Sequence, residues 1–168
     1  MDLKKILKGV KIRAGENIGG IDINKITDDS RKVGVGDLFV ALRGYSLDAS
    51  KFVGFALKAG ARAIVTEKDF NSSPGVSKIL VDDTRSAMSI IADNFYGHPS
   101  RKLKVIGITG TNGKTTIAYL IENIVKAAGK ADAGVIGTIN YRFKGKVFPA
   151  LNTTPGPMIL QGMLAEMA

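Results

Sequence analysis

The glycine-rich stretch at residues 107–116, GITGTNGKTT, is the feature that most constrains this chain. It follows a short β-branched run at 105–108, which is typical of a buried parallel strand, and it precedes a segment with helical spacing of apolar residues. The glycines stand at even spacing and are followed by Lys114 and Thr115. A strand, a glycine turn and a helix in this order predict a phosphate-binding loop.

Each residue type in this loop has a chemical reason to be there. Glycines let backbone N–H groups converge on an anion without an obstructing Cβ atom, and the start of the helix adds partial positive charge. Lys114 is expected to reach the β- and γ-phosphates, and the Thr115 hydroxyl is expected to ligate Mg²⁺. The strict P-loop pattern requires glycine where this chain has Ile108, so the loop is a variant. The alternative interpretation is a glycine-rich turn with an incidental lysine.

Composition restricts the class of protein. The chain has 168 residues, enough for one domain or two small ones, and the absence of cysteine excludes disulfides and thiolate chemistry. It contains no long apolar run and no signal-peptide pattern, so we expect a cytoplasmic protein without membrane insertion. The net charge of +9 favours anionic partners. The basic residues are scattered without interleaved aromatic residues, which argues against a nucleic-acid surface.

Hydrophobic periodicity predicts alternating helices and strands before residue 97. We expect helices over 2–9, 50–59 and 84–95, and strands at 21–27, 38–42, 63–65 and 79–81. Thr84 is expected to cap the helix that it begins. The helix at 50–59 is expected to place four apolar residues on one face: Phe52, Phe55, Ala56 and Ala59.

A break at 97–102 separates two α/β units, which we place at residues 1–98 and 99–168. After the glycine loop we expect a helix over 117–128, a strand at 133–139 beside the first strand, a hairpin over 141–148, a polar loop at 152–157 and a helix over 158–168. About two or three strands follow the break, whereas a P-loop sheet usually needs ~5 to bury both faces. The chain therefore looks like the N-terminal part of a longer protein.

The glycine loop resembles the ATP-binding loop of the Mur ligases and their relatives, the folylpolyglutamate and cyanophycin synthetases, in which the departure at Ile108 is the norm. Within the Mur ligases, residues 27–44 resemble a uridine-binding domain, 95–100 an interdomain linker, and 151–155 a muropeptide-binding loop. The resemblance covers essentially the whole chain. It implies an α/β protein in which a mixed-sheet uridine-binding domain precedes the start of a parallel-sheet P-loop ATPase domain.

The resemblance also implies a reaction, ATP-dependent amide-bond formation in peptidoglycan precursor synthesis. ATP would phosphorylate the D-Glu carboxylate of UDP-MurNAc-L-Ala-D-Glu. The amine of a diamino acid, meso-diaminopimelate or L-lysine, would then attack the acyl phosphate. The implied cofactors are ATP and Mg²⁺, and the implied partners are the UDP-MurNAc-dipeptide and the diamino acid, with no nucleic acid.

By the same resemblance, site residues can be assigned. The ATP site would contain Gly110, Thr111, Asn112, Gly113, Lys114, Thr115 and Thr116, with Lys114 catalytic and Thr115 a metal ligand. The substrate would contact Asp28, Ser30, Tyr45, Ser46, Leu47, Asn152, Thr153 and Thr154. Thr138 is expected near the metal or the phosphates. His98, the single histidine, is expected to have a structural role because it precedes a proline in the linker.

Three alternatives remain open. The first is another ligase of the same superfamily, although the sequence Asp28-Asp29-Ser30-Arg31 argues against a folylpolyglutamate synthetase. The second is a nucleotide- or UDP-sugar-binding module that performs no chemistry alone. The third is a P-loop nucleic-acid protein, which would depend on the positive charge. The identity of the diamino acid and the oligomeric state cannot be read from these residues.

Overall fold

The computed structural model of the chain describes residues 1–43, 49–129 and 132–168. The chain forms two compact units, Met1–Gly97 and His98–Ala168, and each is described by itself. Three of the predicted substrate residues, Tyr45, Ser46 and Leu47, lie outside the described residues.

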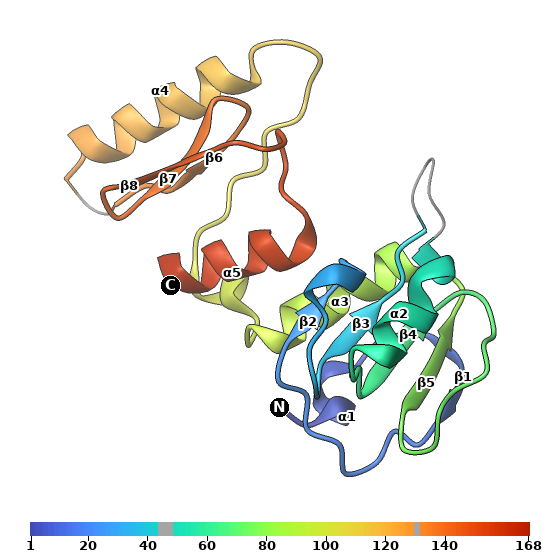
Figure 1. The fold of residues 1–168 in the computed structure, drawn as a ribbon. Coiled ribbons are helices and arrows are strands. Elements are labelled where there is room, and N and C mark those ends of the chain that lie inside the picture. The colour runs from blue at the N-terminus through green and yellow to red at the C-terminus, as the bar shows by residue number, and fades with distance from the viewer. Residues whose placement is uncertain (44–48, 130–131) are drawn as a thin grey trace. The chain divides into compact units, whose positions relative to one another are not determined.

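The first unit is built on a mixed five-stranded sheet in the order β1-β5-β4-β3-β2 (Figure 1). The strands are β1 (Ile12–Glu16), β2 (Ile26–Thr27), β3 (Leu38–Val40), β4 (Ala63–Thr66) and β5 (Ser77–Val81). Strands β2 to β5 run parallel to one another, and β1 pairs antiparallel with β5 at the edge. The predicted mixed sheet is therefore confirmed, and the carboxyl ends of four strands share one edge.

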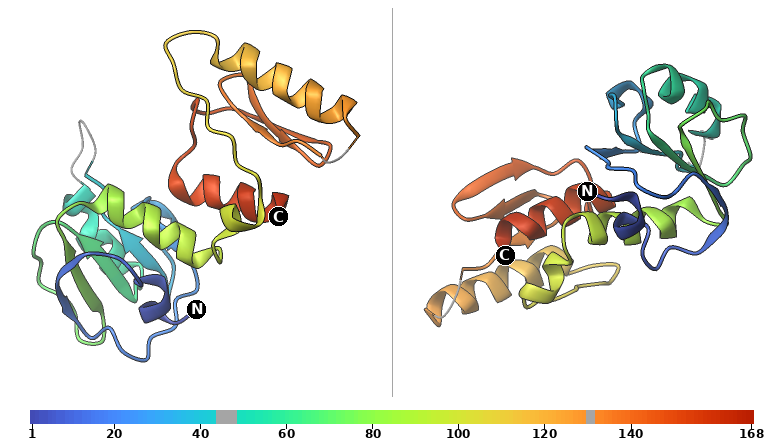
Figure 2. Two further views of the ribbon diagram at one scale, coloured as in Figure 1. Left: turned by 180° about the vertical axis from the view of Figure 1, so that it is seen from behind. Right: turned by 90° about the horizontal axis from the view of Figure 1, so that it is seen from below.

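Helices cover both faces of this sheet (Figures 1 and 2). Helix α2 (Val53–Lys58) lies on one face, and α1 (Leu3–Ile6) lies with α3 (Thr84–Phe95) on the other. Two short 3₁₀ helices, η1 (Ser30–Lys32) and η2 (Ala49–Phe52), precede β3 and α2. Phe39 and Ile64 are paired in register on β3 and β4, and both pack with Ala56 of α2 in a core where all three are fully buried.

Four details of the first unit differ from the sequence predictions. Strand β1 was not predicted, because all of its residues are exposed and show no apolar alternation. The strand predicted over 21–27 is limited to Ile26–Thr27. Asp83, not Thr84, is the N-cap of α3, since its carboxylate accepts from the N–H groups of Arg85 and Ser86. Phe55, predicted on the same helical face as Ala56, is 64% exposed, whereas Ala56 is fully buried.

The second unit combines two helices with a small antiparallel sheet in the order β6-β7-β8. Its elements are η3 (Pro99–Lys102), α4 (Lys114–Ala127), β6 (Val135–Ile136), β7 (Asn140–Phe143), β8 (Lys146–Pro149) and α5 (Pro157–Met167). Helix α4 lies alongside the sheet (Figures 1 and 2). The predicted hairpin is confirmed, and its turn residues Lys144 and Gly145 have φ angles of 49° and 73°.

The strand predicted at 105–108 does not form, so the prediction of a buried parallel strand is wrong for the described residues. Val105 and Ile106 are 60% and 63% exposed. The physical reason is the lack of a neighbour: the strand predicted beside it is reduced to Val135–Ile136, which pairs antiparallel with β7. The helix after the loop forms as predicted. In the described ranges, no helix is long and apolar enough for a membrane span.

Candidate functional site

The glycine loop leads directly into helix α4. Gly113 is the N-cap with φ 77° and ψ −10°, a left-handed conformation that costs a side-chain-bearing residue energy. Its carbonyl accepts the N–H of Ile117 at 2.9 Å, which closes the first helical turn. No side chain caps the first turn of α4. Its leading N–H groups are therefore available to an anion, as the sequence predicts for a phosphate-binding loop.

The Lys114 ammonium group lies over this loop. Its Nζ donates to the carbonyl oxygen of Gly110, and to that of Thr111 at 3.3 Å. These bonds explain how a cation is held at a helix start, where the helix dipole opposes it. The loop residues 109–113 are exposed, and Lys114 and Thr115 are half-buried. Main-chain donors and one ammonium group thus face the same solvent-accessible turn.

A metal ion would find few protein ligands here. Within the described ranges, no group of three or more histidine, aspartate or glutamate side chains could hold a metal. Mg²⁺ in phosphoryl-transfer sites is usually bound by one or two carboxylates together with substrate phosphates and water. The Thr115 hydroxyl fits as one ligand in such a set, and the described residues add no carboxylate cluster to it.

The polar loop at 151–154 is exposed and is held by residues around strand β7. The Tyr141 hydroxyl donates to the Asn152 carbonyl at 2.5 Å and accepts the Asn152 N–H at 3.2 Å. The Thr138 and Thr153 hydroxyls lie 3.2 Å apart. The structure therefore brings two of the residues singled out by sequence, Thr138 and Thr153, into direct contact. The approach of Thr138 to a phosphate stays a prediction.

Helix α4 is tied to the sheet by an ion pair that sequence reasoning missed. Arg142 on β7 donates from Nε to both Glu122 carboxylate oxygens, at 3.1 and 3.2 Å, and also donates from its terminal nitrogen. Its guanidinium carbon lies 4.0 Å from the centre of the Tyr119 ring. Glu122 is 5% exposed, and hydrogen bonds from Arg142 and then Lys126 lower its pKa to about 2.

The spacing of Glu122 and Lys126 is a readable i,i+4 signal, and the two groups lie 3.1 Å apart. No sequence signal pairs Glu122 with Arg142 twenty residues later. Of the two cations bound to Glu122, the more buried one, Arg142, is therefore the one that periodicity could not find.

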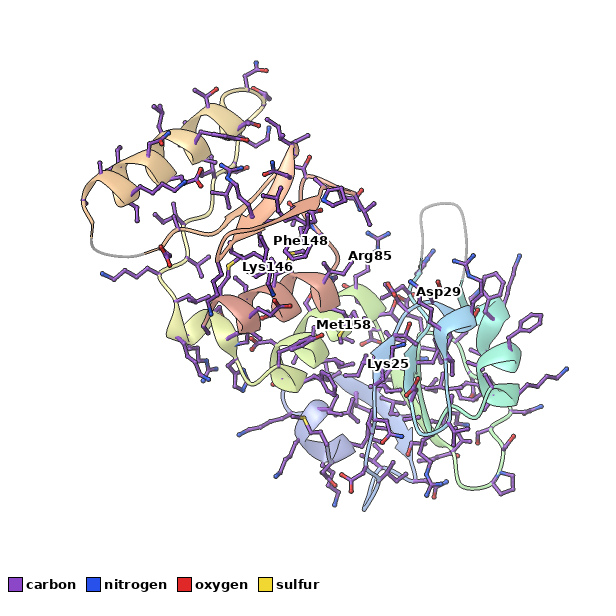
Figure 3. The ribbon with its side chains drawn as sticks, turned by 60° about the vertical axis from the view of Figure 1, so that its left-hand side comes forward. Lys25, Asp29, Arg85, Lys146, Phe148 and Met158 are labelled. Carbon is purple, nitrogen blue, oxygen red and sulfur yellow. The ribbon has the colours of Figure 1, made fainter. Side chains whose placement is uncertain are left out.

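In the first unit, two predicted substrate residues follow the carboxyl end of β2. Ser30 is half-buried at the first position of η1, and Asp28 is exposed with no partner among the described residues. Between them, Asp29, labelled in Figure 3, caps η1 by accepting the Arg31 N–H at 3.1 Å, and it binds the Arg31 guanidinium through two 2.9 Å bonds. These hydrogen bonds lower the pKa of Asp29 to about 2. Lys25 donates to the Lys32 carbonyl at 3.3 Å, so cations surround this turn.

A second network missed by sequence reasoning lies at the same edge of the sheet. The Thr84 N–H and hydroxyl donate to the Glu67 carboxylate at 3.0 and 2.8 Å. The Thr84 hydroxyl in turn accepts the Arg43 N–H at 3.1 Å. This network fixes the point where the chain leaves β3, immediately before residues 44–48. Thr84 was predicted to cap the helix, but its hydroxyl instead forms the hydrogen bonds of this network.

Both units match known protein families. The description "Mur ligase family, catalytic domain" matches residues 22–96, and "Mur ligase middle domain" matches residues 108–168. The second match includes most of the glycine loop, all of α4 and the polar loop. The two matched ranges lie on either side of the break at 97–102.

Individual proteins are similar over nearly the whole chain. UDP-N-acetylmuramoyl-L-alanyl-D-glutamate–2,6-diaminopimelate ligases from Listeria innocua and Caldanaerobacter subterraneus are 40% and 41% identical over 99% of the chain. The chain spans about a third of these relatives, 33% and 34% of their length. A solved structure of a ligase with the same name covers all of this chain with a TM-score of 0.76 and 25% identity, and 33% of that protein is covered.

Proposed function

We propose, from the premise that this chain belongs to the Mur ligase family, that it is the amino-terminal part of an ATP-dependent ligase of peptidoglycan precursor synthesis. The proposed ligase adds a diamino acid to UDP-MurNAc-L-Ala-D-Glu. Identity of 40% or more to relatives named diaminopimelate ligases supports this substrate pair and favours 2,6-diaminopimelate as the amino acid. Because the chain spans a third of those relatives, we propose that this part alone binds ligands without turning them over.

The single observation that carries the proposal is the uncapped start of α4 beneath the Lys114 ammonium group. The main-chain N–H groups from Gly110 to Thr116 would hold the triphosphate of ATP. Lys114 would leave the loop carbonyls and stabilise the charge on the γ-phosphoryl group as it passes to the D-Glu carboxylate. The amine of the diamino acid would then attack the acyl phosphate, forming the amide and releasing inorganic phosphate.

The two units would bind different parts of the substrates. We propose that residues 1–98 bind the UDP end, through Ser30 and Asp28 among the cations around η1. Residues 99–168 would begin the ATP-binding domain, and the exposed side chains of Asn152 to Thr154 would hold the muramyl-peptide end. Mg²⁺, when bound, would neutralise phosphate charge, and Thr115 is the one ligand that we propose for it. ATP and a UDP-linked substrate would place the reaction in the cytoplasm.

The test is the change Lys114→Ala in the whole ligase, with Lys104→Ala as the matched control. Lys104 is an exposed lysine ten positions earlier, and it makes no side-chain hydrogen bond or ion pair among the described residues. Phosphate release that depends on both UDP-MurNAc-L-Ala-D-Glu and diaminopimelate is expected to fall by about 10³-fold or more in Lys114→Ala, because a positioned cation is lost from the transferred group. Ligation at the wild-type rate in that variant would remove Lys114 from the mechanism and, with it, the proposed phosphate site.

A further inference from the structure

We propose that Tyr141 is a positioning residue for the loop at 151–154, and that strand β7 ties this loop to helix α4. The inference rests on the proposed function, because it concerns the residues assigned there to the muramyl-peptide. It adds a residue, Tyr141, that the proposed function assigns to no ligand.

Tyr141 holds the backbone of one residue through both of its peptide groups. Its side chain is 3% exposed, and on the sheet it pairs in register with Phe148 of β8, labelled in Figure 3. From this fixed position, one hydroxyl group donates to the Asn152 carbonyl at 2.5 Å and accepts the Asn152 N–H at 3.2 Å. The two bonds flank the Asn152 Cα, so they restrain both backbone dihedrals of that residue.

A second contact from the same segment holds the next residue of the loop. The Thr138 hydroxyl, three positions before Tyr141, lies 3.2 Å from the Thr153 hydroxyl. Pro155 follows as a buried residue with a restricted φ angle. The exposed loop is thus anchored through the backbone of Asn152 and the side chain of Thr153, and the buried Pro155 follows it.

The opposite face of the same strand contacts the nucleotide helix. Successive residues of a strand point to opposite faces, so Arg142 lies on the other side of β7 from Tyr141. There it binds the Glu122 carboxylate and stacks on the Tyr119 ring, and both residues belong to α4. Helix α4 begins at Lys114. Two adjacent residues of β7 therefore link the loop assigned to one substrate with the helix assigned to the other.

The experiment is Tyr141→Phe in the whole ligase, because this change removes only the hydroxyl. The KM for UDP-MurNAc-L-Ala-D-Glu is expected to rise about tenfold, the value of one lost hydrogen-bond anchor, while the KM for ATP stays within about twofold. Tyr96→Phe is the control, since its hydroxyl has no partner among the described residues and it lies in the first unit. Thr138→Val removes the second anchor without loss of volume and is expected to raise the same KM about threefold.

Equal increases in the KM for ATP and for the UDP-MurNAc-dipeptide would show a general loosening and overturn the proposal, as would no change in either.

A second measurement needs no activity: hydrogen exchange of the Asn152 amide in this chain. Exchange is expected to become about tenfold faster in Tyr141→Phe and to stay unchanged in Tyr96→Phe. An unchanged Asn152 rate in Tyr141→Phe overturns the proposal. If the wild-type ligase and the Tyr96→Phe control fail to ligate while Asn152 exchange responds as expected, the proposed function fails and the anchoring of the loop stands.

Discussion

The ion pair between Glu122 and Arg142 makes the free energy of unfolding of the second unit depend on pH. Glu122 is nearly buried, and its pKa is lowered from 4.5 to about 2 by hydrogen bonds from Arg142 and Lys126. A folded-state pKa below the unfolded value means that the unfolded chain binds the proton more readily. The contribution of the pair to stability is therefore complete above about pH 4.5 and is lost as the pH falls toward 2.

The size of this loss of stability follows from the shift in the pKa of Glu122. A difference of about 2.5 pKa units corresponds to about 3 kcal/mol, of which about 2 kcal/mol is lost by pH 3. Glu122→Gln leaves the largely buried Arg142 without its counter-charge, so we expect it to destabilise the unit by about 3 kcal/mol at pH 7. At pH 2 the wild type has itself lost most of this contribution, and the difference between the two proteins should nearly vanish.

Urea unfolding, followed through the amide NMR signals of α4 and β7, reports on the second unit separately from the first. Glu166→Gln is the matched control, because Glu166 is an exposed glutamate 3.5 Å from Lys146, and such a pair contributes at most about 1 kcal/mol. The reasoning fails if Glu122→Gln costs no more than Glu166→Gln at pH 7. It also fails if the cost of Glu122→Gln is the same at pH 7 and pH 2.

Two further outcomes are expected in the first unit. Thr84→Val should lower the free energy of unfolding by about 1–3 kcal/mol in urea unfolding, because the Glu67 carboxylate loses a buried hydroxyl donor. Ser89→Ala, at an exposed position of the same helix, is the control and should change stability by less than about 0.5 kcal/mol. Arg31→Ala should raise the pKa of Asp29 from about 2 toward 3.8, as followed by the carboxyl ¹³C signal, and an unchanged titration would show that Arg31 is not the cause.

The elements that could be predicted are those whose own residues determine them. Strand β3 and residues 63–65 of β4 are continuous apolar runs that are buried on both faces. The hairpin turn at Lys144-Gly145 has the left-handed backbone that its glycine favours. Helix α4 follows its apolar spacing even though Ile117, Leu120 and Ile124 remain 45% or more exposed. In each case the local pattern is sufficient, whatever the element later contacts.

The elements that could not be predicted depend on a partner elsewhere in the chain. Strand β1 has only exposed residues, and it exists because its backbone pairs with β5. The segment at 105–108 shows the opposite case. Its β-branched residues favour a strand, but no neighbouring strand pairs with it among the described residues, so no strand forms there. Asp83 and Thr84 are both suitable caps by residue type, and the Glu67 carboxylate decides between them by binding the Thr84 hydroxyl.

The buried ion pair shows the same limit at the candidate site itself. An arginine in an alternating strand and a glutamate in a helix each indicate a solvent-exposed face when considered alone. Here each can be buried only because the other supplies the opposite charge, since an unpaired buried charge would cost several kcal/mol or more. Burial of Glu122 and burial of Arg142 are therefore one event, and it requires α4 to lie against β7. The contact that links helix α4 to the strand holding the loop at 151–154 is thus encoded by two positions that look like surface.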